Sequence, residues 1–80
     1  MINLEVKTTL SIPEVCSRLK LFFGKELGLK IVDDSPSCLS FEGSGGYVNA
    51  IVCKEGDQTN LNLKAMEWEA QVKKFASHLP

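Results

Sequence analysis

The apolar residues that follow Leu10 recur every three or four positions, which is the spacing of one face of an α-helix. Ser11 and Glu14 form a capping box at the start of this segment, because each side chain can bond the backbone amide of the other residue. Gly28 follows the last apolar position, as a left-handed residue that ends a helix would. The pattern predicts a helix from Ile12 to Leu27 with an apolar stripe of Ile12, Val15, Cys16, Leu19, Phe22, Phe23 and Leu27. Leu21 is the exception, since it falls among the polar positions.

Most of the remaining chain alternates apolar and polar residues with a period of two, which is typical of strands with one buried face. Clusters of turn-forming residues at 33–37, 43–46 and 55–57 divide these stretches. The pattern predicts strands at 2–10, 29–33, 38–42, 47–54 and 59–65. The stretch 47–54 is apolar on both faces, which indicates a central strand or one whose second face is covered.

The last stretch returns to a helical period and places Trp68, Val72, Phe75, Ala76 and Leu79 on one face. The order of elements is therefore β-α-β-β-β-β-α. Short turns join the second to fifth strands into an antiparallel meander, and the first strand then pairs beside the last. The sequence predicts a single α+β domain over residues 1–80, with a five-stranded antiparallel sheet in the order 1-5-4-3-2 and both helices on one face.

This succession of elements resembles the repeat unit of the TATA-box-binding-protein-like fold and the minimal part of the helix-grip architecture of START and Bet v 1-like proteins. The resemblance covers the whole chain and rests on element order, so it implies a fold and not a shared activity. Helix-grip proteins hold apolar ligands between helix and sheet, which would give a pocket lined by Phe22, Phe23, Phe41, Trp68 and Phe75. The alternative is that these rings fill the core, since an empty cavity costs several kcal/mol.

Composition narrows the classes of partner. The formal net charge of the 80 residues is −1, with acids and bases interspersed, so electrostatics favours neither nucleic acid nor an anionic membrane. A TATA-binding saddle inserts phenylalanines from its sheet face, and the outer face predicted here carries none. No apolar run reaches the length of a bilayer span, and the first residues lack the pattern of a signal peptide. We therefore expect a cytoplasmic protein that does not bind nucleic acid.

The residues with reactive side chains form no catalytic or metal-binding pattern. Cys16, Cys38 and Cys53 are widely spaced, and the single histidine, His78, lies near the chain end. We expect three free thiols, no structural zinc, no cofactor and no enzymatic activity. The glycine-rich stretch 43–46 precedes a strand and lacks lysine, so we expect a hairpin turn rather than a phosphate loop.

The outer face of the predicted sheet, on the side away from the helices, bears most on function. This face carries fewer charges than a free sheet face normally does. An exposed, weakly polar face of this kind is typical of a partner site. We hypothesise that it contacts a protein partner, most often a second copy of the chain, through Val32, Cys38, Tyr47, Asn49, Ile51 and Cys53. The sequence thus predicts a non-enzymatic interaction or homodimerisation module. The alternatives are a small apolar-ligand or lipid-binding domain, and an ordinary sheet face decorated with asparagine and serine.

Overall fold

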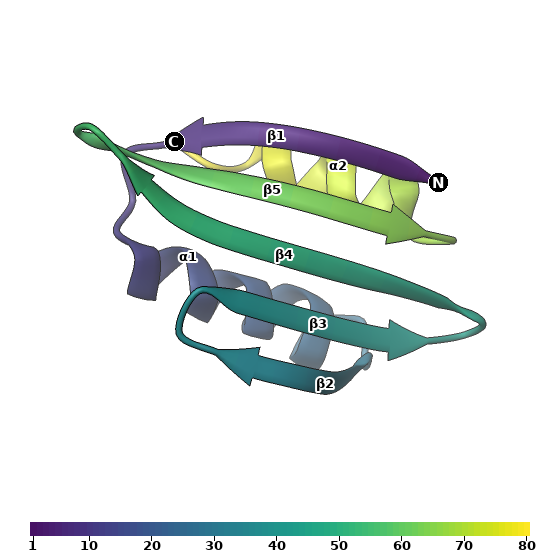
Figure 1. Ribbon diagram of the computed structural model, residues 1–80. Helices are drawn as coiled ribbons and strands as arrows, with labels where there is room; N and C mark the ends of the chain where they lie inside the picture. The colour runs from purple at the N-terminus through teal and green to yellow at the C-terminus, as the bar shows by residue number, and fades with distance from the viewer.

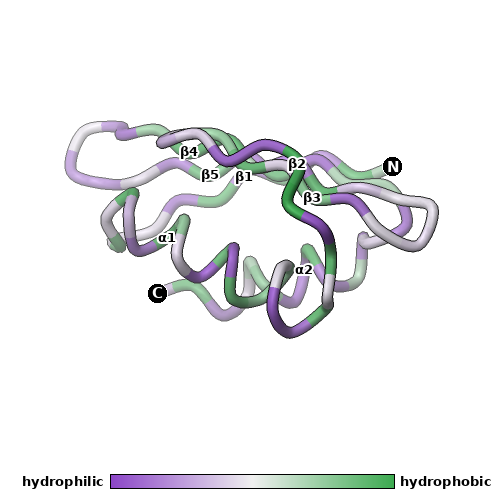
Figure 2. The backbone as a smooth tube through the Cα atoms, turned by 90° about the horizontal axis from the view of Figure 1, so that it is seen from below, coloured by the Kyte–Doolittle hydropathy of each residue, from purple (hydrophilic) through white to green (hydrophobic).

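The computed structural model describes residues 1–80 and consists of one sheet covered on one side by helices (Figure 1). The elements are β1 (Ile2–Thr8), α1 (Ile12–Leu19), η1 (Lys20–Glu26), β2 (Lys30–Ser35), β3 (Cys38–Gly43), β4 (Gly46–Glu55), β5 (Gln58–Met66) and α2 (Glu69–Ser77). All neighbouring strands pair antiparallel in the order β1-β5-β4-β3-β2, which confirms the predicted topology. Figure 2 shows the two layers edge-on, with both helices below the sheet.

The core lies between the two layers. Every second residue of the three middle strands points toward the helices, as the alternation predicts. The fully buried side chains of these strands are Leu39, Phe41, Val48, Ala50, Val52, Leu61, Leu63 and Ala65. They meet Val15, Leu19, Phe23, Val72 and Phe75 from the helical layer. Nearly all buried apolar area of this small chain is therefore on one side of the sheet.

The start of α1 confirms the predicted cap. The Glu14 amide donates to Ser11 Oγ at 3.3 Å, and the Ser11 hydroxyl donates to Glu14 Oε1 at 3.2 Å. The carboxylate therefore accepts from the Ser11 hydroxyl, whereas a standard capping box would use the Ser11 amide. The proline in the first turn has no N–H of its own that would need a partner there, and its fixed φ suits the start of a helix.

The predicted helix continues through Glu26, but its second half is wider than an α-helix. Lys20–Glu26 forms the π-helix η1, and the Leu27 amide donates to Phe22 O, five residues back, at 3.0 Å. Gly28, at φ +73°, then ends the helix as predicted. The expectation of one uniform α-helix is wrong in this half, because apolar periodicity does not distinguish the two hydrogen-bonding patterns.

The strand β2 is longer than predicted. The predicted strand ends at Asp33, where the turn cluster 33–37 begins, yet β2 runs to Ser35 and only Pro36 and Ser37 form the turn. A bulge between Ile31 and Asp33 shifts the register, and Asp34 pairs with Lys20 of η1 at 3.0 Å. Acidic, turn-forming residues therefore lie in an edge strand, where their side chains are solvated.

The glycine-rich hairpin between β3 and β4 is confirmed. Ser44 and Gly45 both have positive φ, as a two-residue type I′ turn requires. A side chain at Gly46 would collide with the backbone carbonyl of Met66, so this position needs glycine for close approach. The hairpin also accepts a hydrogen bond at Gly43 O from the indole N–H of Trp68, at 3.0 Å.

Candidate interaction surface

The centre of the outer sheet face is an exposed isoleucine. Ile51 lies on β4, the middle strand, opposite Cys38 on β3 and Asn62 on β5. Its side chain is 55% exposed although two strands flank β4 on either side. Exposure of a large apolar residue here is therefore not an effect of a sheet edge. Both helices lie on the other side of the sheet, and no element of the chain covers the outer face (Figure 1).

Around Ile51 the face forms a shallow hollow of about 390 Å³ that spans β1, β4 and β5. Its lining consists of Asn3, Asn49, Ile51, Cys53, Asn60, Asn62 and Lys64. Three residues of the predicted interface, Asn49, Ile51 and Cys53, thus lie together. The sequence reasoning missed Asn3 and Lys64, which face each other across β1 and β5. The predicted pairing of the first strand with the last could have identified both residues, because it places Asn3 opposite Lys64 on the outer face.

The other predicted interface residues differ in their distance from this hollow. Cys38 borders it directly through Ile51. Tyr47 is half-buried near the beginning of β4, opposite Glu42 and the exposed Met66. Val32 is exposed but lies at the bulge of β2, with the whole of β3 between it and β4. The structure therefore gathers Cys38, Asn49, Ile51, Cys53 and Tyr47 on adjacent positions and leaves Val32 apart.

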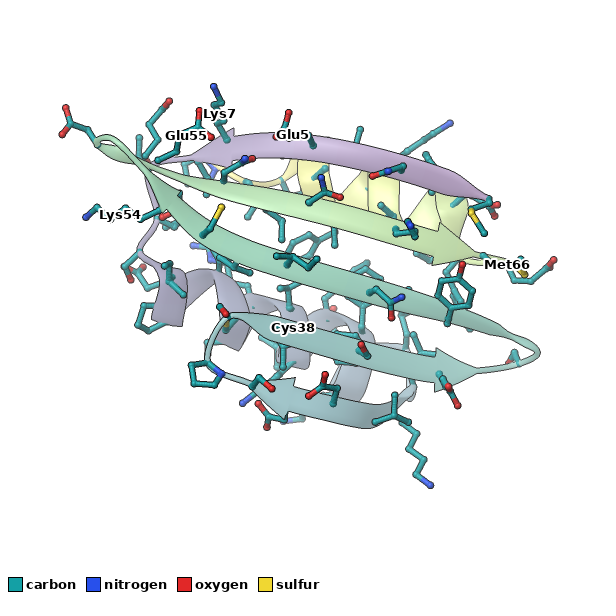
Figure 3. All side chains as sticks on the ribbon, viewed as in Figure 1. Glu5, Lys7, Cys38, Lys54, Glu55 and Met66 are labelled. Atoms are coloured by element: carbon teal, nitrogen blue, oxygen red, sulfur yellow. The ribbon has the colours of Figure 1, made fainter.

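Charges on this face lie at the strand ends and on the edge strand β1. Figure 3 shows Lys7 and Glu55 together at one end of the sheet, where Lys7 Nζ lies 3.1 Å from Glu55 Oε1. Glu5 lies in the middle of β1, opposite Asn62, which in turn lies opposite Ile51. At the other end of the sheet, Lys30 lies opposite Glu42. Lys64 is the one charged side chain lining the hollow, so charges of both signs surround the uncharged residues around Ile51.

Asn60 links the charged end to the hollow. Its Nδ2 donates to Glu5 Oε2 at 2.9 Å and to Glu55 Oε2 at 3.1 Å. Because both partners are acceptors, the orientation of the carboxamide is fixed. Its Oδ1 is buried and receives no hydrogen bond from the chain. The two donated hydrogen bonds hold the Asn60 side chain between the acidic pair and the hollow that it lines.

The aromatic residues of the predicted apolar pocket pack against one another. The ring centroid of Phe23 lies 5.6 Å from those of Phe41 and Phe75, and 4.9 Å from that of Phe22 in an edge-to-face contact. Trp68 packs at the margin of this cluster, held by its bond to the hairpin. None of the cavities in the structure is lined by Phe23, Phe41 or Trp68. The space between helices and sheet is filled by the rings themselves.

The three cysteines are free and differ in environment. Cys16 is half-buried, with Sγ 3.8 Å from the carbonyl oxygen of Pro36. Burial raises the pKa of the Cys16 thiol, and the nearby Lys20 ammonium opposes this only in part. Cys53 is exposed in the hollow. No group of three His, Cys, Asp or Glu side chains is placed to hold a metal ion.

The carboxyl of Glu69, at the start of α2, also has a shifted pKa. The amino group of Met1 lies 3.0 Å from Glu69 Oε2 at the start of α2. This hydrogen bond, with one from the Glu69 backbone amide, lowers the pKa of the Glu69 carboxyl. The contact joins β1 to α2 and lies outside the hollow.

The helices are short relative to a bilayer, and none combines the length and apolarity needed to cross one. No known protein-family model matches the chain, and no curated protein matches it.

Proposed function

We propose that this chain is a non-enzymatic interaction module that binds a second copy of itself through the outer face of its sheet. The observation that carries the proposal is the exposure of Ile51 in the middle strand, within a nearly uncharged surface. A free sheet face is ordinarily solvated and polar, whereas exposed apolar residues among uncharged neighbours are typical of an interface.

The size of the face suits a dimer. The two larger extents of the molecule are 36 and 21 Å, so a standard interface, which buries roughly 800 Å² on each partner, would need most of this face. Burying an isoleucine side chain contributes about 1.5–3 kcal/mol. Ile51, together with its neighbours Tyr47 and Cys53, can supply the apolar centre of such a contact.

The polar groups favour a copy of the chain over a strongly charged partner. The strand ends carry acids and bases in pairs, so two copies can meet without net repulsion. Carboxamides both donate and accept, which lets the asparagines of the hollow bond one another across a two-fold contact.

The resemblance in element order supports the same face. In the TATA-box-binding-protein-like fold the sheet face is the binding surface. We propose a protein rather than nucleic acid as partner here, because this face has no phenylalanine and no excess of bases.

Ile51→Lys tests the proposal. Sedimentation velocity from about 5 to 500 µM should show the wild type becoming dimeric, while the variant stays monomeric with an unchanged melting temperature at the lowest concentration. Leu21→Lys is the matched control, because Leu21 is similarly exposed, at 53%, but lies on the helical side. It should leave the dimer intact. A wild type that stays monomeric at 500 µM, or an Ile51→Lys variant that still dimerises, would overturn the proposal.

A further inference from the structure

The helical layer carries a second surface feature, a groove between the two helices. It has a volume of about 170 Å³ and is lined by Arg18, Leu21, Phe22, Glu26, Phe75, His78 and Leu79. Four of these side chains are apolar. The groove lies on the opposite side of the molecule from Ile51, so it is independent of the proposed dimer contact.

The wide turn of the helix helps to build this groove. In η1 the adjacent residues Leu21 and Phe22 both line it, although Leu21 falls among the polar positions of a regular α-helix. The Phe22 ring lies 5.7 Å from that of Phe75, which closes the floor. Leu21 remains 53% exposed at the rim. Short π-helical segments are rare and frequently occur at functional sites.

The two ends of the groove differ in charge. Arg18 and His78 line it, and Arg18 forms no ion pair within the chain. Glu26 also lines a neighbouring cavity with Ala70, Gln71 and Lys74, near the beginning of α2. The antiparallel course of the helices thus separates a basic end, at Arg18, from a mixed end, at Glu26. An unpaired guanidinium beside apolar walls is complementary to a carboxylate.

We propose that this groove binds a small apolar carboxylate, with a chain of about six to eight carbons. A groove of about 170 Å³ that opens to solvent has room for a short hydrocarbon chain, since it is smaller than the roughly 300–1,000 Å³ of a drug-sized site. The hydrocarbon chain lies against Leu21, Phe22 and Leu79, and the carboxylate accepts hydrogen bonds from Arg18. This site differs from a helix-grip pocket, because the ligand lies on the outer side of the helices and leaves the aromatic core closed.

Octanoate is the probe. Titrated into ¹⁵N-labelled protein, it should shift the backbone amide resonances of residues 18–22 and 75–79 and leave those of residues 49–53 in place. A ligand of ten heavy atoms at about 0.4 kcal/mol per atom corresponds to a Kd of about 1 mM. Octan-1-ol and octylamine, of equal chain length, should bind at least about tenfold more weakly, since neither can pair with a guanidinium.

Arg18→Gln should weaken octanoate binding about tenfold, because it removes a charge-assisted hydrogen bond. Lys25→Gln is the matched control: it removes the same charge from the same helix, and Lys25 lines no cavity. It should leave the affinity unchanged. Ile51→Lys should also bind octanoate normally, which keeps this test separate from the test of dimerisation.

Four outcomes would overturn the site. The first is the absence of any shift at about 10 mM octanoate. The second is equal binding of octan-1-ol, and the third is a set of shifts confined to the outer sheet face. The fourth is an Arg18→Gln variant that melts at a lower temperature but binds octanoate as the wild type does, since this would show that Arg18 only stabilises the fold.

Discussion

The two faces of β4 differ in what covers them far more than in their composition. On one side Val48, Ala50 and Val52 are completely buried beneath the helices. On the other side Ile51 and Cys53 are exposed, and Tyr47 and Asn49 are partly accessible, although three of these four residues are apolar or aromatic. The apolar residues along a strand therefore indicate whether one or both faces favour burial, while the topology determines which face the helices bury. The uncovered apolar face is what suggests a partner.

Truncation on each face should give the largest contrast. Leu63→Ala removes a fully buried side chain from the inner face of β5 and should lower the free energy of unfolding by about 3 kcal/mol. Ile51→Ala should change it by less than about 0.5 kcal/mol in the monomer, because the side chain is already half-solvated. Urea unfolding at about 5 µM, followed by circular dichroism, measures both. Comparable losses for the two variants would mean that Ile51 is packed within its own chain.

The sequence alone predicts much of the covered side. Alternation in the middle strands and the capped helix at Ser11 were sufficient for the strand order and for the layer that each face joins. The wide turn of η1 could not be predicted, since Leu21 and Phe22 are apolar in either helical form. The extension of β2 consists of the pairs Asp34–Leu39 and Ser35–Cys38 after a bulge, and no local pattern in 33–37 distinguishes this pairing from a longer turn.

On the outer face, the sequence predicts which residues of a strand face outward better than it predicts which residues of different strands lie together. Alternation places Asn49, Ile51 and Cys53 on one face of a strand, as observed. Their junction with Asn3 and Lys64 follows only from the pairing of β1 with β5, which joins segments about sixty residues apart. The groove between the helices was missed, because Leu21 looked like an irregularity of the apolar stripe.

A smaller loss of stability is expected from a substitution at Asn60, which links the hollow to the charged end of the outer face. Asn60→Asp would place a carboxylate where the amide now donates to Glu5 and Glu55, and should cost about 1–2 kcal/mol at pH 7. Asn49→Asp adds the same charge to the same face, opposite Lys64, and should cost less than about 0.5 kcal/mol. Thermal or urea unfolding of the two variants compares them directly. Equal effects would indicate that the loss reflects overall charge rather than the Asn60 contacts.

The reactivities of two cysteines compare the two sides of the sheet without any substitution. Cys53 is exposed on the outer face, whereas Cys16 is half-buried on the helical side and has a pKa above its usual value of 9.0. Less of Cys16 is therefore thiolate at pH 8, so iodoacetamide should modify Cys53 faster by about fivefold or more. Peptide mass mapping over time gives both rates in one sample.

The same two thiols can report on the uncovered face as the protein concentration changes. If two copies meet around Ile51, modification of Cys53 should slow as the concentration rises from about 5 to 500 µM. The rate at Cys16 should stay constant, since that thiol lies on the far side of the sheet, next to Pro36. A Cys53 rate that does not depend on concentration would show that the hollow stays open to solvent. A parallel slowing of both thiols would point to aggregation instead, because a contact through one face protects only the side chains on that face.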